Sequence, residues 1–241
     1  MISVDSLLYK IDQRLNKLST NDHQQIQLED KILALNEAQI KLIKQKIEGV
    51  SVANGLGMGA TKKRYSDLQK LVEPYKPLTL ELTDKRLNKY SASLNALTPK
   101  FMFYANSYFL ANKGRCKDRV IWINSDLTKH GDVQVLLNNE HYKPSFEYQE
   151  SFNLISSDDI TIFTDGTFKP TKLYLSYIRY PLYINKTGYE DFDGNPSTDQ
   201  DCELEVYLED ELVDLTVQNL AMYTENAIAV QSSQFRIQTN E

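Results

Sequence analysis

The chain has 241 residues, 41% hydrophobic and 25% charged, so it can bury a sizeable core as one large domain or two small ones. This composition argues against a disordered chain. The 27 basic and 33 acidic residues give a formal charge of -6, which argues against tight, sequence-independent DNA binding, because such binding works by neutralising phosphates.

The two cysteines, Cys116 and Cys202, lie far apart and form neither a metal-binding spacing nor a disulfide framework. A reducing cytoplasm is therefore the expected compartment. No apolar run reaches the roughly 20 residues that a membrane span needs, so we expect no membrane association. The residues from Met1 onward lack the basic and apolar segments of a secretion signal.

The first fifty residues predict two amphipathic helices. Apolar residues recur at helical spacing over 4–18 and again over 28–47, with turn-forming residues at 19–22 between them. Gly49 would end the second helix. A short polar link between two such helices favours an antiparallel pair.

A glycine-rich stretch at 49–60 precedes the basic triplet Lys62, Lys63 and Arg64. A phosphate-binding loop would need glycine before the lysine and a strand before the loop, but Thr61 precedes Lys62 and the preceding element is a helix. We interpret the stretch as a flexible connector. The triplet fits either the solvated start of a short helix or a contact for DNA phosphates or an acidic partner.

A short helix should follow the triplet and end before Pro74, after which the apolar period shifts toward two. A helix over 127–139 would interrupt the sheet, and Asp165 with Gly166 is typical of a hairpin turn between two strands. The predicted strands are 78–82, 101–104, 120–123, 146–154, 160–163 and 173–180.

A final acidic helix follows Cys202, and its leucines Leu208, Leu212 and Leu215 form an apolar stripe that should pack on the N-terminal helix pair. Acidic residues in its first turns suit the positive end of the helix dipole. Helices, then a mainly antiparallel sheet, then a helix predict an α+β fold. The predicted portions are a helical bundle at 1–73 and 203–228, a β-rich portion with one embedded helix at 78–183, and an exposed loop at 184–202.

Four short segments carry a resemblance that extends over most of the chain. They are Asn36-x-Ala38-Gln39, Leu136-Leu137-Asn138-Asn139 with Lys143-Pro144-Ser145, Tyr177-Ile178-Arg179-x-Pro181, and Cys202-Glu203-Leu204 with the acidic helix through Leu215. Together they resemble virion proteins of crAss-like phages. These are ring or head-to-tail adaptor proteins, similar in role to the tail tubular proteins of short-tailed phages.

This resemblance implies a structural subunit that forms a homo-oligomeric ring, with twelve copies matching a portal, in the head-to-tail connector. The implied partners are the portal, other connector or tail proteins, and genomic DNA that passes without sequence-specific binding. The protein would be assembled in the host bacterial cytoplasm and located in the virion. An acidic chain suits a channel in which DNA slides without sticking.

Two groups of residues are candidates for a subunit interface. One is the basic triplet Lys62, Lys63 and Arg64, and the other is Tyr174, Tyr177, Arg179 and Tyr183 in a tyrosine-rich segment. Tyrosine combines a large apolar ring with a polar tip, so these residues fit a half-buried sheet face, a subunit interface, or both.

No catalytic constellation is visible in the sequence. A calcium loop starting at Asp191 would need glycine at its sixth position and glutamate at its twelfth, where Pro196 and Cys202 stand. Cys202 at a helix start fits an activated thiol less well than a packing residue. We therefore predict no enzyme activity and no cofactor or metal.

Two other functional classes are alternatives to the virion subunit. A β-rich binding module of a phage fibre or accessory protein is the main alternative, against which the helical first fifty residues argue. A cryptic nuclease would need clustered carboxylates, and only the acidic loop at 191–201 offers them.

Overall fold

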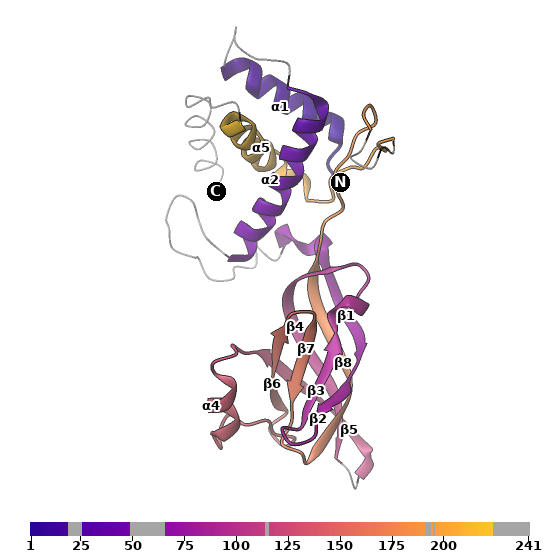
Figure 1. Cartoon of the computed structure of the whole chain (residues 1–241), viewed down its shortest axis with the longest axis vertical. Coiled ribbons are helices and arrows are strands. Elements are labelled where there is room, and N and C mark those ends of the chain that lie inside the picture. Colours follow the sequence, from indigo (N-terminus) through magenta and orange to yellow (C-terminus); the bar gives the residue numbers. More distant parts are fainter. Residues whose placement is uncertain (19–25, 49–65, 114–115, 191–193, 195, 224–241) are drawn as a thin grey trace. The chain divides into compact units, whose positions relative to one another are not determined.

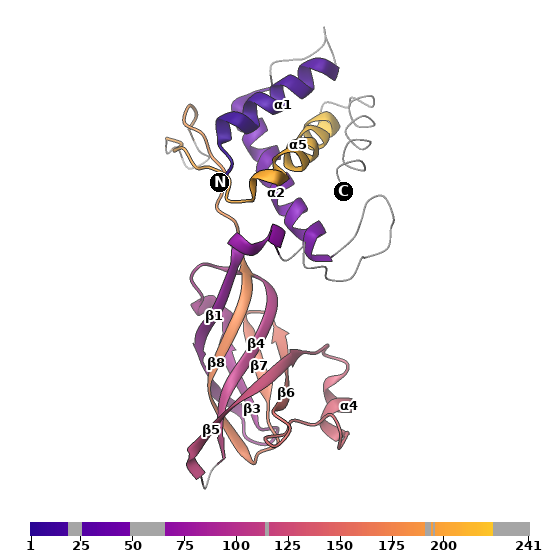
Figure 2. The same ribbon diagram turned by 180° about the vertical axis from the view of Figure 1, so that it is seen from behind.

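The computed structural model describes residues 1–18, 26–48, 66–113, 116–190, 194 and 196–223. It has an α+β fold, as predicted, and divides into two compact units (Figures 1 and 2). We call Met1–Leu71 with Pro181–Glu241 the helical unit, and Val72–Tyr180 the β unit. The chain passes from one unit to the other after Leu71 and again after Tyr180, close to the predicted boundaries. Residues 184–202 belong to the helical unit.

The helical unit is built around helix α5 (Glu209–Tyr223), which packs against both α1 (Val4–Leu18) and α2 (Leu28–Glu48). One 3-10 turn, Val206–Leu208, leads into α5, and another, Gln69–Leu71, ends the first segment of the unit. The predicted packing of the last helix is confirmed, because its three stripe leucines are almost completely buried. These are Leu208, Leu212 and Leu215, at 3%, 0% and 1% exposure.

Ion pairs accompany this apolar packing at the start of α5. The acidic residues there meet basic side chains of α1 and α2, so the helix dipole is not their only source of stabilisation. A hydrogen bond to Glu209 also raises the pKa of Lys10. The pairs are Lys10–Glu209 at 2.9 Å, Arg14–Asp210 at 3.0 Å, Lys46–Glu211 at 2.8 Å and Arg14–Asp214.

Within the helical unit, hydrogen bonds hold the segment after β8 to Asn36 of α2 and to Glu203. Asn36 accepts a hydrogen bond from Ile184 N and donates one to Ile184 O, both at 2.8 Å. Glu203 Oε2 accepts from Leu182 N at 2.9 Å. Ile2 and Cys202 exchange a pair of backbone hydrogen bonds.

The prediction of an exposed loop at 184–202 is therefore wrong in part. Ile184, Ser197 and Cys202 are buried. The sequence there is polar, but its backbone groups find partners in Asn36 and in the N-terminal residues, which allows a polar segment to pack.

The β unit contains one sheet of eight strands in the order β1-β8-β4-β5-β6-β7-β3-β2. All neighbouring pairs are antiparallel except β5–β6, and α4 (Val133–Asn138) lies in the connection between those two strands. The strands are β1 (Val72–Thr79), β2 (Glu81–Asp84), β3 (Lys89–Ser93), β4 (Phe101–Lys113), β5 (Cys116–Leu127), β6 (Glu150–Ser156), β7 (Asp159–Phe163) and β8 (Phe168–Arg179).

Three local predictions are corrected in detail. The short helix before Pro74 includes Ser66 and Asp67 and ends in the 3-10 turn at Leu71, so Val72 already belongs to β1, which continues through the proline, as an edge strand tolerates. The helix over 127–139 shrinks to α4, because β5 extends to Leu127. Asp165 and Gly166 connect β7 to β8, which are not neighbours in the sheet, so the hairpin prediction is wrong.

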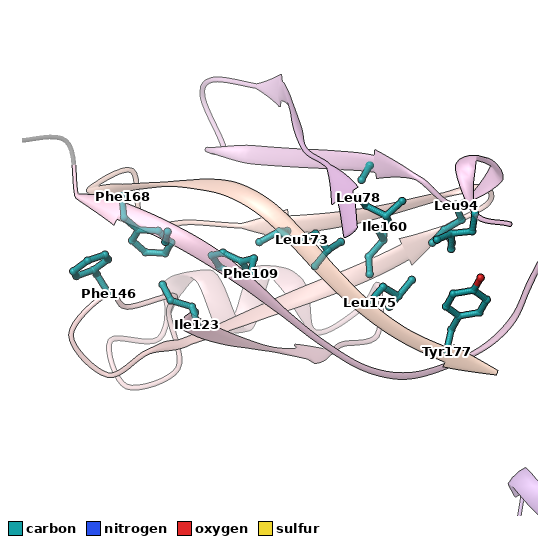
Figure 3. Packing of buried hydrophobic residues seen from close by; sticks show 14 residues of the cluster. Leu78, Leu94, Phe109, Ile123, Phe146, Ile160, Phe168, Leu173, Leu175 and Tyr177 are labelled. Carbon is teal, nitrogen blue, oxygen red and sulfur yellow. The ribbon is translucent and has the colours of Figure 1, made fainter. Parts of the chain in front are cut away.

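The curled sheet encloses its own core. Figure 3 shows side chains from β4, β5 and β8 on the same side as Ile160 of β7, so one face of each of these strands is inside the curl. The fully buried members include Phe109, Ile123, Ile160, Phe168, Leu173, Leu175 and Tyr177. A smaller cluster lies beneath α4, where Val133 meets Phe152, Leu154 and Phe163.

One polar node lies inside the β unit. Asn153 of β6 is fully buried, and its Nδ2 donates to Ser107 Oγ at 2.9 Å and to Ser125 O at 2.9 Å. The Tyr104 hydroxyl donates to the same Ser125 carbonyl at 2.8 Å. The node therefore connects β4, β5 and β6, including the one parallel pair.

Candidate functional site

The most distinctive surface of the described residues is the outer face of four neighbouring strands, β1, β8, β4 and β5. Alternation places Phe109, Leu173 and Ile123 inside the curl, so their strand neighbours point outward. Each of the four strands contributes one aromatic residue to this outer side. We call this set the aromatic face: Tyr75 on β1, Tyr174 on β8, Tyr108 on β4 and Trp122 on β5.

The four rings contact one another. Tyr108 and Tyr174 are cross-strand partners with stacked rings 5.5 Å apart. Trp122 meets both of them edge-on, with centroids 4.9 Å from Tyr108 and 5.3 Å from Tyr174. The Tyr75 ring lies 5.3 Å from that of Tyr108. The cluster spans four strands, yet Tyr75 and Trp122 remain 57% and 51% exposed, which is unusual for such large apolar side chains.

Backbone strain holds one of these rings in place. Tyr75 has a φ of +53° at a β-bulge between Glu73 and Lys76. Its N–H leaves the ladder and donates to Ser176 Oγ at 3.2 Å. A bulky residue in the left-handed region is strained and bulges redirect side chains, so this geometry turns the Tyr75 ring toward Tyr108 at an energetic cost.

Two exposed lysines share the outer face with the rings. The ladder pairs Lys172 with Leu110 and Lys169 with Asn112, and Leu110 in turn pairs with Trp122.

The tyrosines of the face also affect one another's ionisation. Burial, and then the neighbouring Tyr75 and Tyr174 hydroxyls, raise the pKa of Tyr108. Tyr108 is therefore neutral at physiological pH, and the lysines give this end of the face a positive charge.

The interface candidates predicted from sequence do not form one site. Tyr174 belongs to the aromatic face, and Tyr183 is 52% exposed in the helical unit. Arg179 contributes to packing, because its side chain is only 13% exposed and pairs with Glu73 at 3.4 Å. The triplet Lys62, Lys63 and Arg64 lies outside the described residues.

Tyr177 is a correction. It is fully buried in the core of the β unit, and its hydroxyl donates to Pro99 O at 2.6 Å, so it is not available to a partner. The reason is strand alternation: Tyr177 is an odd number of residues from Tyr174, so the two side chains point to opposite faces.

Sequence reasoning missed Tyr75, Tyr108 and Trp122. Period-two alternation through Val120, Trp122 and Asn124 could have placed the only tryptophan on an outer face. The register that brings it to Tyr108 and Tyr174 depends on pairings between strands far apart in sequence.

The surroundings of Cys202 are those of a packing residue. Cys202 is buried, burial raises its pKa to about 11, and Gln39 Nε2 lies 3.8 Å from its sulfur, so it is not an activated thiol. Among the described residues, no group of three or more His, Cys, Asp or Glu is arranged to hold a metal. None of the helices in the described part of the chain is long and apolar enough to cross a membrane.

No protein-family model matches the chain, and no curated protein does.

Proposed function

We propose that the chain is a structural subunit of a tailed-phage virion, which forms an oligomeric ring in the head-to-tail connector and contacts the portal and other connector or tail proteins. Genomic DNA would pass along this ring without sequence-specific binding. The observation that supports the proposal is that two segments of the phage resemblance contact each other in the helical unit, together with the chain that follows a third.

Two of the four segments are joined by a hydrogen bond, and the chain just after a third is held at the same place. Asn36 holds Ile184, which follows closely after the Tyr177–Pro181 segment. Gln39 reaches Cys202, and the adjacent Glu203 holds Leu182. Short matches scattered by chance would not be expected to converge in space, so we attribute the resemblance to a shared structural element.

Ring formation needs a head-to-tail contact whose rotation closes after a whole number of subunits. Interfaces of this kind are centred on exposed apolar and aromatic residues. In the helical unit, Leu182, Tyr183 and Val206 are exposed, at 48%, 52% and 59%. We place one side of the subunit contact at these residues and keep Lys62, Lys63 and Arg64 as the second candidate contact.

Native mass spectrometry of the purified chain, alone and mixed with a crAss-like phage portal, tests the proposal. We expect a ring of portal-matched stoichiometry, and its loss in Tyr183→Ser. Tyr142→Ser is the matched control, since Tyr142 is 66% exposed in the β unit. A chain that stays monomeric at all concentrations, with and without the portal, would contradict the proposal.

A further inference from the structure

The outer face of β1, β8, β4 and β5 has a basic half and an aromatic half. One ladder row contains Lys169, Asn112 and Val120, and the next contains Lys172, Leu110 and Trp122. Two residues farther along β4 and β8, Tyr108 pairs with Tyr174. Since a strand rises about 3.3 Å per residue, successive rows are about 7 Å apart, and lysines and rings lie side by side.

The lysines of this face are available for an anion. Among the described residues of the β unit, ion pairs use Lys76, Lys113 and Arg179, and neither Lys169 nor Lys172 takes part in one. Two acidic residues lie on the opposite side of the rings from the lysines. Asp126 is four residues, or about 13 Å, beyond Trp122 on β5, and Glu150 of β6 pairs with Asn124. The positive charge of the face is therefore confined to the lysine rows.

The β unit differs in charge from the rest of the chain. Residues 72–180 contain 14 Lys and Arg against 12 Asp and Glu, whereas the other residues contain 13 against 21. The formal charge of -6 thus describes neither part. The net charge of the chain therefore does not oppose nucleic-acid binding by this unit.

We propose that this face binds single-stranded nucleic acid. Bases would stack on the exposed rings of Trp122 and Tyr75, and Lys169 and Lys172 would pair with phosphates, which is the combination that sequence-tolerant single-strand binding requires. The strained backbone of Tyr75 keeps its ring on the face without a ligand, so less ordering is needed on binding.

A duplex and a second copy of the chain fit this face less well. The bases of a duplex are stacked inside it and cannot reach the rings of Tyr75 and Trp122. A self-complementary contact would bury the same patch of both copies and so bring four lysine charges into one interface, which is electrostatically unfavourable. The inference stands on this face alone and does not depend on the proposed virion role.

Trp122 provides a direct test, because it is the only tryptophan of the chain and lies in the face. Titration of the full chain with oligodeoxythymidylate of about 16 nucleotides, a length at the upper end of single-strand site sizes, should quench its emission saturably. With two phosphates neutralised, log K should fall against log salt with a slope of about -1.4. A duplex of the same length should quench much less.

Two variants and two controls assign the effect to the face. Lys172→Gln should reduce the slope to about -0.7, and Tyr75→Ala should weaken binding about fivefold or more. Lys129→Gln and Tyr148→Ala, which change exposed residues elsewhere in the β unit, should leave affinity and slope unchanged.

Three results would overturn the inference. The first is unchanged emission at low salt from a chain that circular dichroism shows to be folded. The second is equal quenching by duplex and single strand, which would exclude base stacking. The third is emission that responds to protein concentration but not to the oligonucleotide, which would assign Trp122 to a contact between subunits.

Discussion

The two units of this chain solve the same packing problem by different means. In the helical unit, apolar contacts of α5 are accompanied by ion pairs to α1 and α2, and polar side chains such as Asn36 and Glu203 hold the incoming backbone. In the β unit the curled sheet encloses an apolar core with a polar node at Asn153. Charged and amide side chains therefore connect elements in the first unit, whereas apolar packing inside a closed sheet dominates the second.

The two units also differ in charge. Most acidic residues outside 72–180 belong to the sequence around α5 and the loop before it, where basic partners surround several of them. The β unit has a slight basic excess and presents Lys169 and Lys172 beside exposed rings. A property averaged over the chain, such as its net charge, can therefore mislead when a sequence contains two units.

The largest effect should come from the core of the β unit. Phe109 is fully buried and stacks on Phe168, with centroids 6.2 Å apart, so Phe109→Ala removes a large ring from a closed core. We expect a loss of about 3–5 kcal/mol in the free energy of unfolding. Urea unfolding followed by Trp122 emission reports on this unit, and an unchanged midpoint would contradict the assigned core.

The corresponding change in the helical unit is Leu212→Ala. Leu212 is fully buried where α5 meets its neighbours, and we expect a loss of about 2–5 kcal/mol. Far-UV circular dichroism should shift to lower urea while the Trp122 transition moves less, if the two units unfold separately. Equal shifts in both signals would show that the units unfold as one, and an unchanged helix signal would mean that α5 is not docked.

Ion pairing in the helical unit can be separated from apolar packing at Arg14 and Asp214. The Asp214 side chain is only 1% exposed, so Arg14→Met leaves a buried carboxylate without its cation and should cost about 3 kcal/mol. The double variant with Asp214→Leu should recover most of that loss, because a well-packed apolar pair replaces a buried ion pair at little cost. A double variant as unstable as the single one would show that the pair is needed for more than neutralisation. Chemical denaturation measures all three proteins.

Sequence reasoning could predict those parts of the fold that depend on local periodicity. The helices α1, α2 and α5 and the buried leucines of α5 follow from spacing at three and four residues. Local periodicity does not predict the elements that depend on pairing between segments distant in sequence. β3 has a polar sequence and forms because it pairs between β2 and β7, and the Asp165–Gly166 turn connects strands that pair with others.

The candidate site was only partly predictable for the same reason. Tyr174 was identified, but Tyr177 was grouped with it, although alternation places the two on opposite faces. Tyr75 needs a bulge that no local signal marks, and Trp122 needs the β4–β5 register. A surface formed by four strands that are distant in sequence depends on long-range pairing, which composition and spacing do not contain.

A smaller loss should follow removal of the polar node. Asn153→Ala leaves Ser107, Ser125 and Tyr104 without their shared donor in the interior, and we expect a loss of about 1–3 kcal/mol. The matched control is Asn124→Ala on the outer side of β5, which should change stability by no more than about 0.5 kcal/mol. Urea unfolding followed by Trp122 emission compares the two variants. Asn124→Ala needs its own fluorescence baseline, because Asn124 is two residues from Trp122. Equal stability of the two variants would mean that the node contributes nothing specific.

The smallest expected effect is a dependence of β-unit stability on alkaline pH. Burial raises the pKa of Tyr90, Tyr108 and Tyr177 above the usual value near 10. As pH rises past 10, the unfolded chain loses these protons first, so unfolding becomes more favourable. The stabilisation is thus complete below pH 10 and is lost as pH passes the raised pKa values. Urea midpoints should fall as pH rises from about 10 to 11, and Tyr108→Phe should reduce the fall. Midpoints independent of pH in this range would mean that the three hydroxyls ionise equally well in the folded unit.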